Sequence, residues 1–284
     1  MQASSELEAL ELARTHWTRP LAFVPTMGAL HQGHLDLIDL ARQTAGHEGT
    51  VVVSIFVNPL QFDRKEDLAS YPQTLDHDLE LCRSKGVNFV YHPLAEDFYA
   101  PDHSIHVHEK SLSRHLCGAS RPGHFDGVCT VVLKLLNTVR PDYAIFGKKD
   151  YQQLAIIKRL VRDLSLHVQI VGAETTREDD GLALSSRNRN LTEAQRADAP
   201  RIRRSLLAAR QLVESGETSA EHILTTTRQE LLDQAPADFS IDYLEIVDQE
   251  TLLPRSTLDG PSLMAVAAFY GSVRLIDNIE LELT

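Results

Sequence analysis

Apolar and polar positions alternate along the chain in blocks that predict strands and helices in turn. Short apolar runs without polar alternation predict strands that are covered on both faces. The runs lie at residues 21–26, 50–57, 88–92, 143–146 and 167–171. Besides these runs, a short strand is expected at residues 105–107. Proline and glycine predict a loop at 121–127, and an apolar helix is expected at 128–139. Two of the runs pass through a glycine turn into a helix, which is typical of parallel strands. The pattern therefore predicts an α/β fold, with a parallel sheet and helices on both of its faces.

The last third of the chain has a different pattern. A polar, glycine-containing stretch at 176–189 precedes a helix capped by Thr192 that reaches about Ser215, and a second helix at 220–234. Strands are expected at 239–247, 263–270 and 274–276. We expect two domains, at 1–175 and 176–284, of which the second is a smaller α+β domain.

The first strand–turn–helix junction carries the strongest chemical signal. A strand at Leu21–Thr26 leads through a turn at Met27–Gly33 into a helix from Leu35 onward. Amide N–H groups at a helix start lack intrahelical partners and favour phosphate. His31 and His34, three positions apart, could donate to one polyanion. Two histidines near a helix start are more often solvated or capping groups, but the flanking glycines favour a nucleotide site.

Other candidate residues follow the remaining strands. Asn58 and Gln61 come after the strand at 50–57 and are expected at the ligand-binding edge of the sheet, although Asn58-Pro59 can be a simple turn. A second glycine turn, Gly147–Asp150, opens a helix with two lysines, which an anion would stabilise unless they are solvated surface groups. Further on, Ser185–Arg187 offers donors suited to phosphate oxygens.

Composition narrows the possible functions. The chain has 284 residues, 43% of them hydrophobic and 24% charged, as in an ordinary globular protein. A net charge of -12 argues against a general nucleic-acid binder. The apolar runs are too short to span a membrane and the N-terminal segment is acidic, so we expect an untargeted cytoplasmic protein. Three widely spaced cysteines are expected to be free thiols.

Five stretches, in this order along the chain, resemble the pantothenate synthetase (pantoate:β-alanine ligase) family. They are residues 24–34, with the HxGH motif of the nucleotidylyltransferase superfamily at His31–His34, and residues 54–62, 121–125, 146–153 and 184–188. The resemblance implies a Rossmann-like first domain and an ATP-dependent condensation of pantoate with β-alanine. Pantoyl adenylate would be the intermediate, with AMP and pyrophosphate released. It also implies Mg²⁺ and a homodimer, which is a common state of soluble proteins.

The resemblance also implies roles for individual residues. His34 would be the proton donor, His31 would orient the triphosphate, and Lys149 and Arg187 would stabilise developing charge. Gln61 and Gln153 would hold pantoate, and Gln61 would border the β-alanine site. Asn58, at the same edge of the sheet as Gln61, is expected to contact the substrate as well. The expected ATP contacts are Met27, Gly28, Ala29, Leu30, His31, Gln32, Gly33, His34, Gly147, Lys148, Lys149, Asp150, Thr176, Leu184, Ser185, Ser186 and Arg187.

Two departures from the family pattern affect the metal site. Gln73 replaces a usual arginine, and His77 interrupts the acidic pair, which leaves Asp78 as the better magnesium candidate and Asp76 as the second. Carboxylates in a first helical turn can also simply complement the helix dipole. Because an acyl adenylate must be kept from water, the second domain is expected to act as a lid.

Two alternatives remain. A nucleotidylyltransferase that transfers AMP to a phosphorylated substrate is less consistent with Gln61 and Gln153, since neutral amides suit a hydroxy acid better than a phosphate. A regulatory nucleotide-binding module that has lost catalysis is disfavoured by His34, Lys149 and Arg187.

Overall fold

The computed structural model describes residues 1–62, 68–69 and 71–283. Over these residues the chain divides into two compact units, and each is described by itself. The first unit comprises Met1–Ser111, Arg121–Lys148 and Ile156–Glu174. The second comprises Leu112–Ser120, Lys149–Ala155 and Thr175–Thr284.

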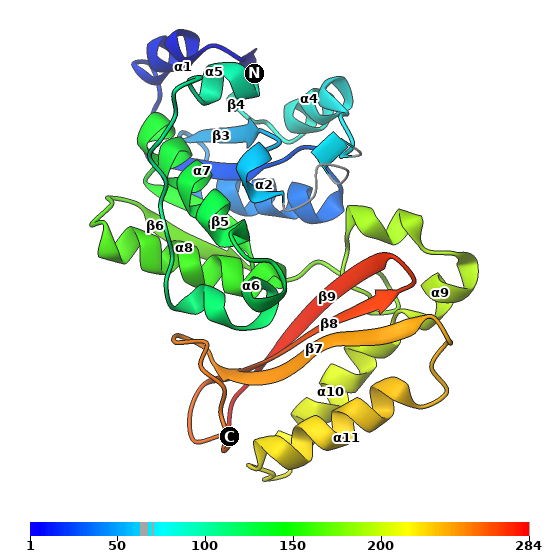
Figure 1. Ribbon diagram of the computed structural model, residues 1–284. Helices are drawn as coiled ribbons and strands as arrows, with labels where there is room; N and C mark the ends of the chain where they lie inside the picture. The colour runs from blue at the N-terminus through cyan, green and yellow to red at the C-terminus, as the bar shows by residue number, and fades with distance from the viewer. Residues whose placement is uncertain (63–67, 70, 284) are drawn as a thin grey trace. The chain divides into compact units, whose positions relative to one another are not determined.

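A parallel sheet forms the centre of the first unit (Figure 1). Within the described residues it has six strands in the order β1-β4-β3-β2-β5-β6, and every neighbouring pair is parallel. They are β1 (Gln2–Ser4), β2 (Leu21–Thr26), β3 (Thr50–Ile55), β4 (Phe89–Tyr91), β5 (Tyr143–Gly147) and β6 (Gln169–Ala173). The predicted parallel sheet is confirmed, and β1 was not predicted.

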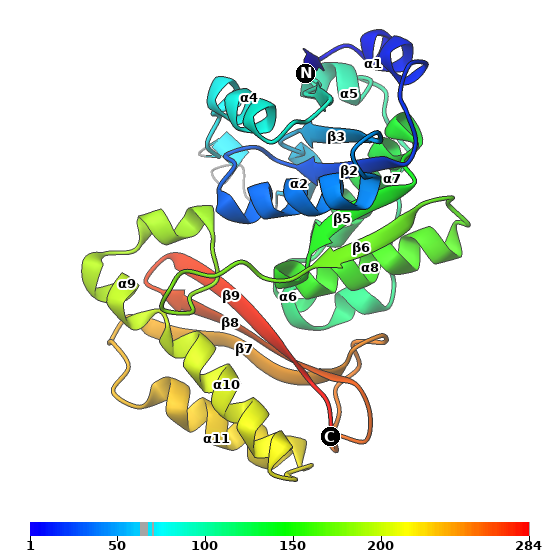
Figure 2. The ribbon, with the colours of Figure 1, turned by 180° about the vertical axis from the view of Figure 1, so that it is seen from behind.

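Helices cover both faces of this sheet, as Figures 1 and 2 show from opposite sides. α2 (Gln32–Ala45) packs Ile38 and Ala41 onto Val24 and Val53 of the two central strands. α7 (His124–Val139) lies on the opposite face. The unit also contains α1 (Leu7–Arg14), η1 (Pro59–Gln61), α4 (Leu75–Ser84) and α5 (Ala95–Phe98), while α8 (Tyr151–Asp163) follows η3 (Lys148–Asp150) and is shared with the second unit.

Three local predictions for this unit are wrong. α2 begins at Gln32 instead of Leu35, because His31 caps it. α7 begins at His124, four residues before the predicted start, and includes Gly127. Gly127 does not mark a loop but lets the α7 backbone approach the backbone of Leu60 closely. A Cβ atom at this position would lie 2.3 Å from the carbonyl oxygen of Leu60. Residues 105–107 form no strand.

The second unit is an antiparallel sheet with two helices on one face (Figure 1). In the described part of this unit the sheet has three strands, β7 (Phe239–Asp248), β8 (Ser262–Tyr270) and β9 (Val273–Leu281). α10 (Arg201–Glu214) and α11 (Ala220–Leu232) pack on them. The helix expected at 192–215 is two helices, α9 (Glu193–Asp198) and α10, because Pro200 has no backbone N–H.

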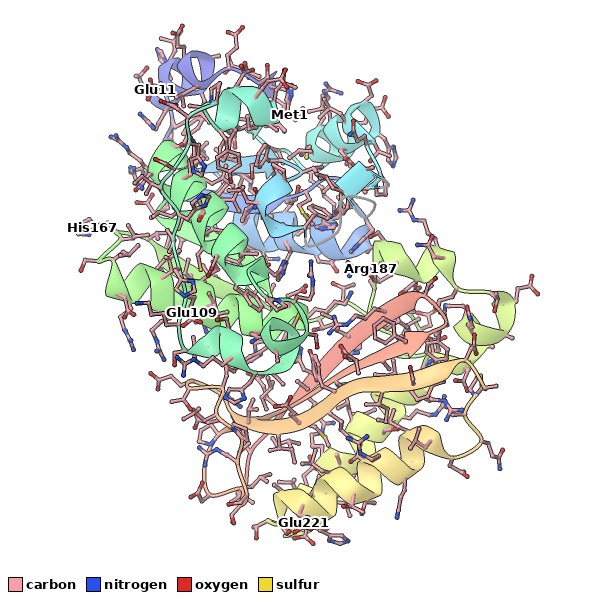
Figure 3. All side chains as sticks on the ribbon, in the orientation of Figure 1. Met1, Glu11, Glu109, His167, Arg187 and Glu221 are labelled. Carbon is pink, nitrogen blue, oxygen red and sulfur yellow. The ribbon has the colours of Figure 1, made fainter. Side chains whose placement is uncertain are left out.

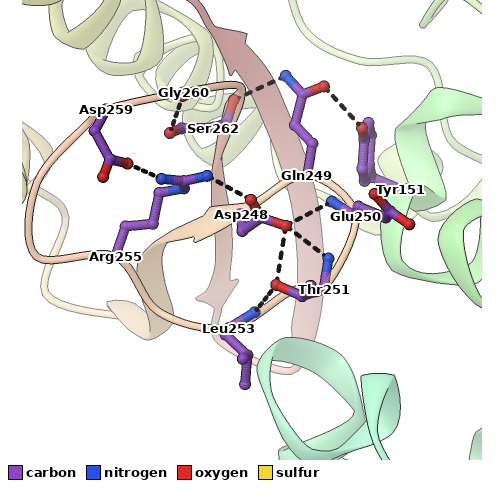
Figure 4. Close-up of polar contacts among 10 residues, drawn as sticks. All are labelled: Tyr151, Asp248, Gln249, Glu250, Thr251, Leu253, Arg255, Asp259, Gly260 and Ser262. Atoms are coloured by element: carbon purple, nitrogen blue, oxygen red, sulfur yellow. Dashed lines mark hydrogen bonds and ion pairs between the residues drawn. The ribbon is translucent and has the colours of Figure 1, made fainter.

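Buried polar contacts hold two segments from earlier in the chain in this unit. Gln152 donates from Nε2 to the carbonyl oxygens of Leu112 and His115, both at 2.7 Å, and accepts from the Gly118 N–H. These contacts fix η2 (Leu112–Arg114) and α6 (Leu116–Ser120). Tyr151 donates to Gln249 in the turn after β7 (Figure 4). α8 therefore begins inside the second unit.

No helix in the described residues has the length and apolar character that crossing a membrane requires.

Candidate active site

The site of the first unit lies where the strand order of its sheet reverses. β3 and β4 lie on one side of β2, and β5 and β6 lie on the other. Such a reversal leaves a crevice outside the carboxyl ends of the strands, where ligands of open α/β sheets bind. The residues that follow β2, β3 and β5 at this edge are Met27–His34, Asn58–Gln61 and Gly147–Lys148. The structure thus brings these predicted residues to one edge.

His31 and His34 form a capping box at the start of α2. The Gly33 N–H donates to Nδ1 of His31 at 3.2 Å, and the His31 N–H donates to Nδ1 of His34 at 3.3 Å. Because both Nδ1 atoms accept, the proton of each neutral ring is on Nε2. The ring centroids are 4.2 Å apart, so the two imidazole rings lie against one another. The capping alternative and the phosphate-binding prediction are therefore compatible.

The turn before these histidines is held by a buried carboxylate. Gly28 and Ala29 have φ angles of 80° and 50°. The N–H groups of Ala29 and Leu30 donate to the two carboxylate oxygens of Asp78, at 2.9 and 2.8 Å. The side chain of Gln32, which was an expected ATP contact, donates to Asp36 on the exposed surface of α2.

Asp76 and Asp78 do not fit a magnesium site. Asp78 is fully buried and already accepts three hydrogen bonds, from the two turn amides and from the Thr74 hydroxyl. Asp76 is exposed. The described residues contain no group of three or more His, Cys, Asp or Glu that could hold a metal ion.

Gln61 is held in place from both ends of its side-chain amide. Its Nε2 donates to the sulfur of Met27 at 2.8 Å, and its Oε1 accepts from Nδ2 of Asn58 at 3.1 Å. Asn58 is buried and also bonds the Gly127 carbonyl oxygen and the Tyr99 hydroxyl. The structure therefore gives Asn58 the task of positioning Gln61, where the sequence had suggested a direct substrate contact.

Arg121 and His124 also support Gln61, and the sequence had suggested no role for them. Nδ1 of His124 donates to the Gln61 carbonyl oxygen at 2.8 Å, while Nη1 of Arg121 donates to Nε2 of His124 at 3.2 Å. Nη2 of Arg121 reaches the same carbonyl. The only sequence signal was their place in the stretch at 121–125, next to a glycine and a proline.

The second unit carries the predicted residues Lys149 and Leu184. Nζ of Lys149 donates to the Leu184 carbonyl oxygen at 2.8 Å, and the Lys149 carbonyl oxygen accepts from Nδ2 of Asn278. Burial lowers the pKa of Lys149, and Arg187 and Arg177 lower it further, against the opposing charges of Asp150 and Asp277. The ammonium group is thus placed beside the segment that leads to Arg187.

A buried ion pair organises the hairpin around Leu184. Arg177 donates to both carboxylate oxygens of Asp277, at 2.7 and 2.9 Å, and the Asp277 side chain is only 3% exposed. The Leu184 N–H donates to the carbonyl oxygen of Thr176. No sequence signal marks this pair, because its members are 100 residues apart.

Other predicted residues are more exposed. Lys148, in the first unit, pairs with the exposed Glu174 at 2.7 Å, as a surface lysine would. Arg187, labelled in Figure 3, is exposed on the short helix η4 (Ser186–Asn190). Ser185 caps this helix by accepting from the Arg187 N–H. Asp150 is exposed, and Gln153 is half-buried in the first turn of α8.

The three cysteines are free, as predicted. Burial raises the pKa of Cys82 and of Cys129 to about 12, with smaller contributions from nearby carboxylates. Neither thiol is suited to act as a nucleophile at neutral pH.

Comparisons with known proteins identify the family. The family profile described as pantoate-beta-alanine ligase matches residues 1–280. The chain is 52% identical over 264 residues to a pantothenate synthetase of Akkermansia muciniphila, covering 92% of each chain. It matches the crystal structure of pantothenate synthetase from Thermus thermophilus with a TM-score of 0.90 and 42% identity, over 98% of this chain and 99% of that one.

A further similar structure contains bound molecules. It is the pantoate-beta-alanine ligase of Francisella tularensis complexed with beta-gamma ATP and beta-alanine, with a TM-score of 0.79, 33% identity and coverage of 98% of this chain and 97% of that one. The profile match and these relatives extend over nearly the whole chain. The chain therefore belongs to the pantoate–β-alanine ligase family.

Proposed function

We propose that this protein joins pantoate to β-alanine in an ATP-dependent reaction through pantoyl adenylate, releasing AMP and pyrophosphate. The observation that carries this proposal is the His31–His34 capping box at the carboxyl edge of the sheet, in a chain that matches the family profile over residues 1–280. The similar ligase of Francisella tularensis, complexed with beta-gamma ATP and beta-alanine, supports both substrates.

The two histidines supply donors to the triphosphate. When the pantoate carboxylate attacks the α-phosphorus, negative charge grows on the phosphoryl oxygens and on the departing pyrophosphate. Donation from Nε2 of His34 and His31 stabilises this charge, and the capping bonds at Nδ1 keep both rings in the required tautomer. The donor role that the family resemblance assigns to His34 would therefore be hydrogen-bond donation from Nε2–H to the phosphate oxygens, with the proton staying on the ring.

Lys149 and Arg187 supply positive charge from the second unit. The bond from Lys149 to the Leu184 carbonyl oxygen keeps the ammonium group beside the segment Ser185–Arg187. We propose that this segment, with Gly147–Asp150, Thr176 and Leu184, contacts ATP. In the first unit, the residues after β2, from Met27 to His34, would contact ATP. Asp78 is not proposed to contact ATP, because its carboxylate oxygens already accept hydrogen bonds from the protein.

Gln61 and Gln153 are proposed to hold pantoate through its hydroxyl groups. The Gln61 amide has a set orientation, since Asn58 donates to its oxygen and its nitrogen donates to Met27. A neutral amide pair binds a hydroxy acid without the charge that a phosphorylated substrate would require. The second step needs no protein nucleophile, because the amine of β-alanine attacks the acyl adenylate.

The C-terminal domain predicted at residues 176–284 is proposed to act as a lid that keeps water from the acyl adenylate, since this intermediate hydrolyses readily. A homodimer in the cytoplasm is also proposed, supported by the family, by the free cysteines and by the frequency of twofold oligomers. Magnesium is proposed to accompany ATP through its phosphate oxygens. We assign no step to the ion, since Asp76 and Asp78 do not fit as its ligands.

Pantoate-dependent exchange of labelled pyrophosphate into ATP tests the proposal. We expect exchange with pantoate in the absence of β-alanine, and none with a phosphorylated substrate in place of pantoate. ATP binding without pantoate-dependent exchange would overturn the ligase function and favour a regulatory module. Exchange that depends on a phosphorylated substrate would favour a nucleotidylyltransferase.

A further inference from the structure

We propose that Asp78 is a positioning residue, whose buried carboxylate shapes the turn that leads into the histidine pair. The inference rests on the proposed function, because the turn matters for catalysis only if His31 and His34 bind the triphosphate. It assigns to Asp78 a task that differs from metal binding.

The contacts of Asp78 account for its burial. Its side chain is fully buried, and an ionised carboxylate in that position is stable only with several hydrogen-bond donors. One oxygen accepts from the Leu30 N–H at 2.8 Å. The other accepts from the Ala29 N–H at 2.9 Å and from the Thr74 hydroxyl at 3.1 Å. Every donor comes from the protein itself.

The backbone of the turn needs such a partner. Gly28 and Ala29 both have positive φ, and for Ala29 this conformation is unfavourable. A turn of this kind aims successive N–H groups in one direction, where a single anion can bind them. The carboxylate of Asp78 takes that place. A Cβ atom at Gly28 would lie 3.0 Å from Oδ2 of Asp78, so the glycine is required for the close contact.

The turn transmits this arrangement to the histidines. Leu30, held by Asp78, directly precedes His31, whose N–H donates to Nδ1 of His34. The start of α2, and with it the direction of both Nε2–H groups, depends on where the chain leaves the turn. Loss of the carboxylate would leave two buried amides without acceptors and release Ala29 from its strained conformation.

ATP binding without a divalent metal separates this role from metal binding. We would titrate ATP into the full chain by calorimetry in EDTA, and repeat the titration with Mg²⁺. For Asp78→Asn, which places an NH₂ group against a backbone N–H, we expect affinity to fall about tenfold in EDTA. Asp76→Asn is the matched control, because it removes the same charge from an exposed position two residues earlier, and it should bind as the unaltered protein does.

The amides of the turn give a second readout. Charge-assisted hydrogen bonds shift amide protons downfield, so the Ala29 and Leu30 signals should move upfield in Asp78→Asn and stay in place in Asp76→Asn. Thr74→Val keeps the carboxylate and removes one donor to it. We expect it to lower metal-free affinity about two- to threefold, and it serves if Asp78→Asn does not fold.

The outcomes are distinct. Equal metal-free affinity of Asp78→Asn and the unaltered protein, with a difference only after Mg²⁺ is added, would overturn the inference and restore a metal role. If Asp78→Asn does not fold, metal-free affinity of Thr74→Val equal to that of the unaltered protein would overturn it. Lack of pantoate-dependent exchange in the unaltered protein would refute the proposed function instead.

Discussion

The two units hold their candidate anion-binding groups in place in different ways. In the first unit the histidines are set by bonds between residues two or three positions apart, within one turn of helix. In the second unit Lys149 is set by a carbonyl oxygen 35 residues away and by Asn278, 129 residues away. The bonds between the histidines are local to the start of α2, although the turn that precedes them is held by Asp78, 48 positions from Leu30. The second arrangement exists only once the whole unit has folded.

This difference affects the electrostatics of each group. The histidine rings have Nε2 left for donation because their Nδ1 atoms accept backbone N–H bonds. Lys149 is a half-buried cation whose pKa is lowered by loss of solvation and by two arginines. The proposed binding of an anion by the two histidines therefore depends on their tautomer and on the direction of their N–H groups. The proposed binding by Lys149 depends on its positive charge. Four predictions test this contrast.

The largest expected effect is that of His34→Ala. It removes both the Nε2–H donor and the acceptor of the His31 N–H, so adenylate formation should fall by about 10²–10⁴. Pyrophosphate exchange measures this rate, and circular dichroism checks the fold. His34→Gln is the matched control, because glutamine at this position can keep the capping bond. It should restore stability more than it restores activity. Near-normal exchange in folded His34→Ala would refute the role of His34.

The next effect is that of Lys149→Met, which keeps the length of the side chain and removes its charge. Exchange should fall about 10²-fold. Because the pKa of Lys149 is lowered, the charged form is lost at a lower pH than for an ordinary lysine. Activity should decline on the alkaline side as that pKa is passed. In Lys149→Arg, any remaining activity should decline at higher pH, since arginine stays charged. An alkaline limb that is unchanged in Lys149→Arg would contradict this assignment.

A smaller effect is expected for Asn58→Ala, a change in the support of Gln61. It removes the Nδ2 donor to Oε1 of Gln61 and to the Gly127 carbonyl oxygen. We expect the KM for pantoate to rise about tenfold and the free energy of unfolding to fall by about 1–3 kcal/mol. Steady-state kinetics and urea unfolding measure the two changes. A change in the KM for ATP with none for pantoate would indicate a different role.

The smallest effect is expected in the turn after β7, away from the proposed chemistry (Figure 4). Burial alone would raise the pKa of Asp248, but bonds from Thr251, Arg255 and Glu250 outweigh it and lower the pKa from 3.8 to about 2. The stabilisation is present above the ordinary pKa and is lost as pH falls through the lowered one.

Asp248→Asn should therefore reduce the free energy of unfolding by about 1 kcal/mol at neutral pH, allowing for screening by water. The difference from the unaltered protein should shrink between about pH 4 and about pH 2. Asp259→Asn, at the exposed second partner of Arg255, is the matched control and should change little. Exchange activity should be unaffected in both. A stability difference that persists in full below the lowered pKa would contradict the assignment.

The sequence by itself determined the parallel sheet, the position of the first junction and the residue types of the site. Strands buried on both faces have a local apolar signature, and the glycine turn with its histidines lies within a few positions of the chain. Helix starts were less well predicted, because the caps depend on side-chain geometry. α2, which His31 caps, begins three residues before the predicted start, and Gly127 packs inside a helix where a loop was expected.

Only the tertiary structure decided the long-range partners. Asp78 occupies a first helical turn, where a carboxylate could complement the dipole or bind a metal, and its contacts with Ala29 and Leu30 span 49 and 48 positions. The pair of Arg177 with Asp277 has no local signature either. Such contacts depend on which segments the fold brings together, and neither composition nor periodicity encodes that pairing.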